Sequence, residues 1–201
     1  MSARIVGCFI AGLILISCFA VGQDQNPLVH PNQEVRVNDL PLHTAQSADS
    51  TAVLVAALET IFHDPDVCCG KNSALQDSGF SAGPLKDLGA RLAGKHYLSD
   101  GRPITVTAEY LSPASINPSQ IIGPLKHQQA VLMEWDSHLY VLYGAVFDEL
   151  LYPSGNRDYV IHKLLLLDTR FSDARREASF NRESDDWTKV SGLLTLAAAA
   201  R

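Results

Sequence analysis

The spacing of the apolar residues changes near residue 103, and this change limits the folds that the chain can adopt. Before that point apolar residues recur at intervals of three and four, which is the period of an amphipathic helix. After it they alternate or run together in short stretches, as they do in β-strands. Helices followed by strands predict an α+β fold with an antiparallel sheet.

Three helices are expected before the change. Asp49 and Ser50 are both able to cap the first helix, because their side-chain oxygens accept hydrogen bonds from the first free N–H groups. Pro84 suits the first turn of the third helix, where no backbone donor is needed. The predicted helices cover 51–62, 69–78 and 84–94.

Four strands are expected after the change. The middle two are separated only by Asp136-Ser137, which predicts a tight hairpin. The last stretch, 187–200, has apolar residues at helical spacing, and we expect a terminal helix there. The predicted strands cover 103–110, 129–135, 138–146 and 159–167.

The N-terminus has the features of a signal peptide over residues 1–22. Arg4 precedes an apolar run, 5–16, which is too short to be a stable membrane span, and small residues follow. Cleavage before Gln23 is one interpretation. The other is a lipobox that ends at Cys18, which would become lipidated and anchor the protein to a membrane. Both predict export to the periplasm or cell envelope.

The remaining chain divides into a linker and one domain. Residues 23–49 are polar and contain three prolines, so we expect a linker with a short extended piece at 34–37. Residues 50–201 are long enough for a single folded domain, which we expect to be monomeric. The net charge of −6, without a basic block, argues against nucleic acid as a partner.

Two of the four cysteines, Cys68 and Cys69, lie in the domain. Adjacent cysteines cannot link distant segments, so the fold has no disulfide framework. An unpaired thiol is unusual in an oxidising compartment. The pair is therefore a nucleophile, a soft-metal ligand, a vicinal disulfide or a buried pair. Gly70 follows Cys69 directly, so we expect Cys69 rather than Cys68 to face a substrate.

A catalytic thiol also needs partners, and later strands supply them. At the expected helix start, the helix dipole would lower the pKa of Cys69. His138 begins one predicted strand, and Asp168 ends the next. In an antiparallel sheet these two positions lie at the same edge, so imidazole and carboxylate are expected to meet there. A base and an orienting carboxylate are what a thiol nucleophile requires.

The order Cys69-Gly70, His138-x-Tyr-Val-Leu-Tyr-Gly144 and a strand that closes at Asp168 resembles the papain-like cysteine peptidases. The most similar group is that of the bacteriocin-leader-processing, or double-glycine, peptidases. The resemblance implies a helix with the cysteine, packed on an antiparallel sheet. It also implies cleavage of a peptide bond in a peptide or protein substrate, with no cofactor.

The resemblance assigns a role to each residue. Cys69 is the nucleophile, His138 is the general base, and Asp168 orients the imidazole. The family has a glutamine six residues before the cysteine, where this chain has His63, so His63 is the expected oxyanion donor. Thr169 follows Asp168, where the family tends to have proline.

Two other hypotheses remain open. In the first, the domain is a non-enzymatic binding module of the envelope or an inactive peptidase relative. A disulfide between the two cysteines would favour this hypothesis. Alternatively, the cysteine pair binds a soft metal such as Zn or Cu(I) with nearby side chains. The residues of this metal hypothesis are His63, Asp64, Asp66, Cys68 and Cys69.

Overall fold

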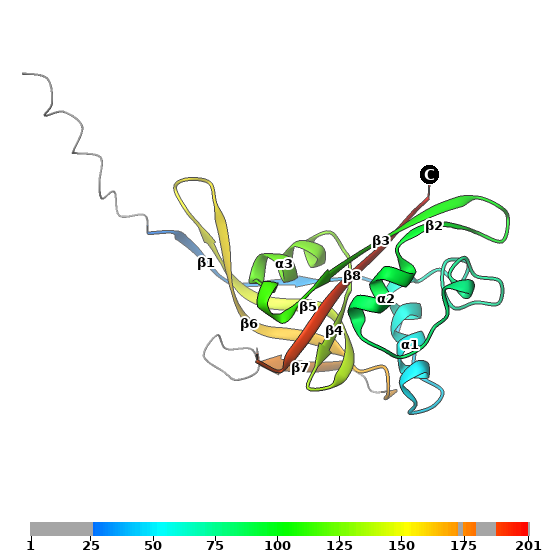
Figure 1. Cartoon of the computed structure of the whole chain (residues 1–201). Helices are drawn as coiled ribbons and strands as arrows, with labels where there is room; N and C mark the ends of the chain where they lie inside the picture. The colour runs from blue at the N-terminus through cyan, green and yellow to red at the C-terminus, as the bar shows by residue number, and fades with distance from the viewer. Residues whose placement is uncertain (1–25, 173–174, 180–187, 201) are drawn as a thin grey trace, which may run out of the picture.

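The computed structural model describes residues 26–172, 175–179 and 188–200, and within them the chain has the predicted α+β class (Figure 1). The predicted leader, 1–22, lies outside these residues. The helices are α1 (Ser50–Phe62), α2 (Leu85–Leu92) and α3 (Pro118–Lys126), with short 3-10 turns η1 (Gln76–Ser78) and η2 (Pro113–Ser115). The strands are β1 (Leu28–Arg36), β2 (Gly94–Tyr97), β3 (Pro103–Leu111), β4 (Val131–Trp135), β5 (His138–Leu151), β6 (Arg157–Leu167), β7 (Arg175–Ser179) and β8 (Val190–Ala200).

The described strands form one antiparallel sheet in the order β2-β3-β8-β4-β5-β6-β7. The long strand β5 pairs with β6 along one side. On its other side its first half pairs with β4 and its second half with β1. Helix α2 packs on β3 and β8, α1 contacts β5 and β8, and α3 lies against β1, β5 and β6 (Figure 1). The helices and the sheet therefore share one apolar core.

Helix α1 confirms the first predicted helix. Asp49 is its cap, since the carboxylate accepts hydrogen bonds from the N–H groups of Thr51 and Ala52 at 2.9 and 3.1 Å. The helix ends at His63, whose backbone is left-handed and whose N–H bonds to the carbonyl oxygen of Glu59. This cap leaves the side chain of Ser50, the first helical residue, free for other contacts.

The predicted hairpin is also confirmed. Asp136 and Ser137 separate β4 from β5, with φ angles of 49° and 61°. Two successive residues in the left-handed region form the turn whose twist matches that of antiparallel strands. His138 consequently begins β5 directly after the turn.

The terminal helix expected at 187–200 is wrong, because 190–200 forms the strand β8. This strand lies between β3 and β4 and pairs with both. The neighbouring side chains of Leu193 and Leu194 point to opposite faces of the sheet, yet both are buried. A strand that is covered on both faces has a continuous apolar run, which periodicity cannot distinguish from a helix.

Two other elements differ from the expectations. The strand expected at 34–37 in the linker is longer, since β1 spans Leu28–Arg36 and pairs with the second half of β5. Helix α3 was not predicted. It begins with the capping box of Asn117 and Gln120 and contains Pro124, which interrupts the helical period of its sequence. In the described part of the chain, no helix combines the length and apolar character needed to cross a membrane.

Candidate functional site

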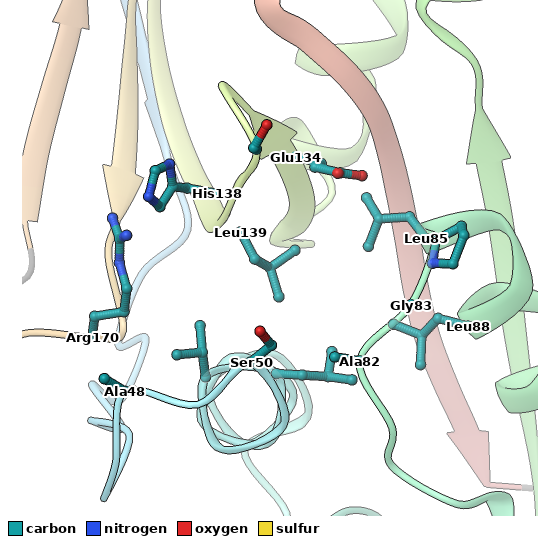
Figure 2. A pocket seen from close by; sticks show the side chains of 14 residues that line it. Ala48, Ser50, Ala82, Gly83, Leu85, Leu88, Glu134, His138, Leu139 and Arg170 are labelled. Atoms are coloured by element: carbon teal, nitrogen blue, oxygen red, sulfur yellow. The ribbon is translucent and has the colours of Figure 1, made fainter.

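A cleft of about 590 Å³ opens where the N-terminus of α1 faces the β4–β5 hairpin (Figure 2). Its lining combines apolar side chains with hydroxyl, carboxylate, imidazole and guanidinium groups. The main apolar residues are Val53, Leu54, Leu85, Leu88 and Leu139. The polar residues are Ser50, Glu134, Ser137, His138 and Arg170.

Ser50 lies at the end of α1 that borders the cleft, and Figure 2 shows its hydroxyl directed into the open space. The neighbouring carboxylate of Asp49 occupies the first free N–H groups of the helix. Hydrogen bonds from Ser47 and from the N–H groups of Ala52 and Thr51 lower the pKa of Asp49. Asp49 therefore stays ionised at neutral pH and satisfies the helix end without help from a ligand.

His138 stands on the opposite rim, beside Arg170 (Figure 2). Its Nδ1 lies 2.7 Å from the backbone carbonyl oxygen of Asp136. A carbonyl oxygen only accepts hydrogen bonds, so Nδ1 carries the proton and Nε2 is the basic nitrogen of the neutral ring. The hairpin thus fixes the tautomer of His138, a task that the sequence had assigned to Asp168.

Asp168 follows β6 and is fully buried. Its carboxylate accepts hydrogen bonds from Nε and Nη2 of Arg170 at 2.7 and 2.6 Å, and Arg176 lies 3.5 Å away. Burial alone would raise the pKa of Asp168, but the hydrogen bonds from Arg170 and the two positive charges outweigh it and lower the pKa. The structure therefore pairs Asp168 with arginines.

Cys69 lies in the loop that follows α1, where a disulfide bond links it to Cys68. The helix expected at 69–78 is wrong, since this segment forms turns and only the short η1 is helical. Cys69 itself has a left-handed backbone, with φ of 70°. Cys69 is therefore not the first residue of a helix, as the sequence predicted, and its sulfur is bonded and not a free thiol.

Gly70 has a structural explanation. A Cβ atom at this position would lie 2.4 Å from the carbonyl oxygen of Pro65. The backbone at residue 70 packs so closely on Pro65 that only glycine fits. Close approach within the loop, and not the approach of a substrate, therefore accounts for this glycine.

Cys69 and the end of β6 contact opposite sides of α1. The Cys69 sulfur lies 3.9 Å from the carbonyl oxygen of Val55, while the Thr169 hydroxyl donates a hydrogen bond to that of Val53 at 3.2 Å. Residues two apart on a helix are rotated by about 200° about its axis. Helix α1 thus separates Cys69 from the residue that follows Asp168.

His63 lies at the C-terminal end of α1, and Ser50 and the cleft lie at the other end, about 20 Å away along the helix. The pKa of His63 is lowered, mainly by burial and to a smaller extent by the charge of the nearby His43. The four predicted catalytic residues are therefore not brought together: His138 lines the cleft, Asp168 is paired with Arg170, His63 caps the far end of α1, and Cys69 lies in the loop that follows.

The metal hypothesis has no assembled ligand set either. In the ranges that the structure describes, no three His, Cys, Asp or Glu side chains are grouped in a way that suits a metal ion. Asp64 accepts a hydrogen bond from the N–H of Asp66, and both cysteines are joined to each other.

Sequence reasoning missed Ser50, Glu134 and Arg170 as members of the cleft. The predicted cap at Asp49 and Ser50 and the predicted hairpin did place two walls of the cleft, but nothing in the sequence indicated that they face each other. Comparisons with protein-family models, curated proteins and solved structures found no match for this chain.

Proposed function

We propose that this chain is an exported binding module, related to the papain-like peptidases, that holds peptide segments in its cleft without thiol catalysis. The observation that carries the proposal is the position of Cys69. Its sulfur is bonded to Cys68 and contacts the side of α1 that faces away from Thr169. A thiolate that attacks a peptide bond needs a free sulfur, and the sulfur of Cys69 is not free.

The order of elements supports the relationship to the papain-like peptidases. Cys69 follows α1 and is not carried by a helix, but α1 packs against an antiparallel sheet, His138 begins β5, and Asp168 follows the neighbouring strand β6. The leader at 1–22 supports export, which cell fractionation of the full chain would test.

The lining of the cleft supports a peptide as the ligand. Leucine side chains offer apolar surface to a side chain of the peptide, while Ser50 and Ser137 offer hydroxyl groups to its backbone. Glu134 and His138 provide charge or hydrogen bonds on the rim. A peptide combines apolar side chains with a hydrogen-bonding backbone, so it matches both parts of this lining.

The proposal is tested with the mature chain, without residues 1–22, immobilised and exposed to short synthetic peptides of random sequence. Bound peptides are identified by mass spectrometry. Replacing Ser50→Trp fills the cleft with an indole and is expected to abolish enrichment. Ser154→Trp is the matched control, because Ser154 lies in the turn after β5, outside the cleft lining.

Peptides that are enriched by the wild type and by Ser154→Trp, but not by Ser50→Trp, would support the proposal. Equal enrichment by all three proteins, or none, would contradict it. Cleavage of the peptides that stops with Cys69→Ser would instead support the cysteine peptidase.

A further inference from the structure

The loop that contains the disulfide holds its shape through its own backbone hydrogen bonds. The N–H groups of Val67 and Cys68 both donate to the carbonyl of Asp64 at 3.0 Å. Further along, the N–H of Leu75 donates to the carbonyl of Val67 at 3.1 Å. Val67 and Leu75 are buried and anchor the loop in the core. These hydrogen bonds and buried side chains are expected to keep the loop folded when the disulfide is reduced.

The two cysteine residues differ in exposure. Cys68 is 2% exposed and belongs to the core, while Cys69 is only partly buried and packs on that core from outside. An attacking thiolate must reach a sulfur directly, so Cys69, the less buried of the two residues, is the expected point of attack.

We propose that the Cys68–Cys69 disulfide is a thiol–disulfide exchange site whose reaction partner is a dithiol. A thiolate of the dithiol attacks the Cys69 sulfur and forms a mixed disulfide, and the Cys68 sulfur leaves and takes up a proton. The second thiol of the partner then attacks the partner's first sulfur, which is bonded to Cys69 in the mixed disulfide. The sulfur of Cys69 leaves and takes up a proton. Two electrons and two protons pass from the dithiol, which becomes a disulfide, to the cysteine pair.

The adjacency of the two cysteines selects a dithiol over a monothiol. In a mixed disulfide with a monothiol, the Cys68 thiol is next to the Cys69 sulfur at a high effective concentration. It attacks that sulfur, expels the monothiol and restores the original bond. A dithiol escapes this reversal because its second thiol completes the reaction within the same complex.

Reduction has a local consequence at α1. The disulfide sulfur of Cys69 carries no hydrogen, so its 3.9 Å approach to the carbonyl of Val55 is a contact and not a hydrogen bond. The reduced thiol of Cys69 carries a hydrogen that it can donate to the carbonyl oxygen of Val55. Reduction also opens the ring that the disulfide closes between the two adjacent cysteines, so the left-handed backbone of Cys69 is no longer held by it. Neither cysteine lines the cleft, so the exchange site is separate from the proposed peptide site.

The test treats the oxidised mature chain with dithiothreitol or with reduced glutathione at equal thiol concentration, without denaturant. The reductant is then removed, iodoacetamide is added together with denaturant so that buried thiols are trapped as well, and peptide mapping assigns them. We expect alkylation of both cysteines after dithiothreitol and of neither after glutathione. Hydrogen exchange is expected to rise in 64–75 and in α1 only, with the sheet still protected.

Two variants identify the reactive sulfur. Cys68→Ser leaves the accessible Cys69 thiol and is expected to form a stable adduct with oxidised glutathione. Cys69→Ser leaves only the buried thiol and is expected not to react. An equal response to both reductants, reduction only in denaturant, loss of protection across the sheet, or free thiols in the untreated protein would each overturn the proposal.

Discussion

Replacing Asp168→Asn removes a buried charge after β6 and tests whether this carboxylate is a structural residue. In the structure it binds Arg170 through both of its oxygens, at 2.7 and 2.6 Å. Asparagine keeps the shape and one accepting oxygen, but it loses the charge. The guanidinium of Arg170 is then left without its counter-ion in a site where its side chain is 24% exposed.

The expected loss follows from these contacts. Hydrogen bonds that involve a charged group contribute about 1.5–3 kcal/mol each, and removing one partner of a buried ion pair costs about 3–5 kcal/mol. Arg170 keeps part of its hydration, and asparagine still accepts one hydrogen bond. We therefore expect the free energy of unfolding of Asp168→Asn to fall by about 2–4 kcal/mol.

The chain contains a matched control at Asp100. Asp100 and Arg102 have the same spacing as Asp168 and Arg170, and they make the same contacts through Nε and the backbone N–H. The side chain of Asp100 is 50% exposed, whereas that of Asp168 is 0% exposed. Because water replaces the exposed ion pair at little cost, Asp100→Asn is expected to leave the unfolding free energy unchanged.

The dependence on pH gives a second readout. The pKa of Asp168 is lower in the folded protein than its ordinary value of 3.8, so its ionised form stabilises the fold above that value. This contribution is lost as the pH falls below about 4, through the folded pKa. Urea unfolding followed by circular dichroism is expected to show a large difference between wild type and Asp168→Asn at neutral pH and a smaller one in acid. Equal effects of Asp168→Asn and Asp100→Asn, or a pH-independent difference, would refute this reasoning.

Three further perturbations test the fold around the cleft. Deleting 190–200 removes the strand between β3 and β4, so we expect the truncated chain to show no cooperative thermal unfolding transition. If this segment were a peripheral terminal helix, the truncated chain would still unfold cooperatively. A Cβ at Gly144 would lie 2.7 Å from the carbonyl oxygen of Val35, so Gly144→Ala is expected to lower stability by about 1–3 kcal/mol. In Gly123→Ala the Cβ meets open space within a helix, so stability is expected to rise by about 1 kcal/mol. If Gly144→Ala and Gly123→Ala changed stability in the same direction, the close packing of β1 on Gly144 would be contradicted. Thr169→Val removes the hydrogen bond to Val53 and should cost about 1 kcal/mol in chemical denaturation, while Thr169→Ser should keep most of it, and an equal loss in both would contradict this tie between β6 and α1.

The sequence predicted those parts of the fold whose signals are local. The cap of α1 and the turn at Asp136 and Ser137 depend on the chemistry of a few neighbouring residues, and both are confirmed. Strand β8 depends instead on its place in the middle of the sheet, which buries Leu193 and Leu194 on opposite faces. Only the assembled sheet supplies this information, so the apolar run was mistaken for a helix.

The candidate site shows the same limit. His138 was found because it starts a strand after a recognisable turn. The role of Cys69 depended on a helix that does not form, because the loop closes on itself at Gly70 and Pro65. Ser50 and Glu134 come together only through the packing of α1 on the sheet, and no spacing in the sequence encodes that contact.

The state of Cys69 in the untreated protein distinguishes a disulfide-linked loop from a catalytic thiol. The chain without residues 1–22 is purified without reductant, exposed to iodoacetamide over a range of pH, digested, and mapped by mass spectrometry beside His138→Ala. We expect a linked Cys68–Cys69 peptide and no alkylation of Cys69 in either protein. Alkylation of Cys69 with an apparent pKa well below the free-thiol value of about 8.5, lost in His138→Ala, would contradict this expectation and support a thiolate–imidazole pair.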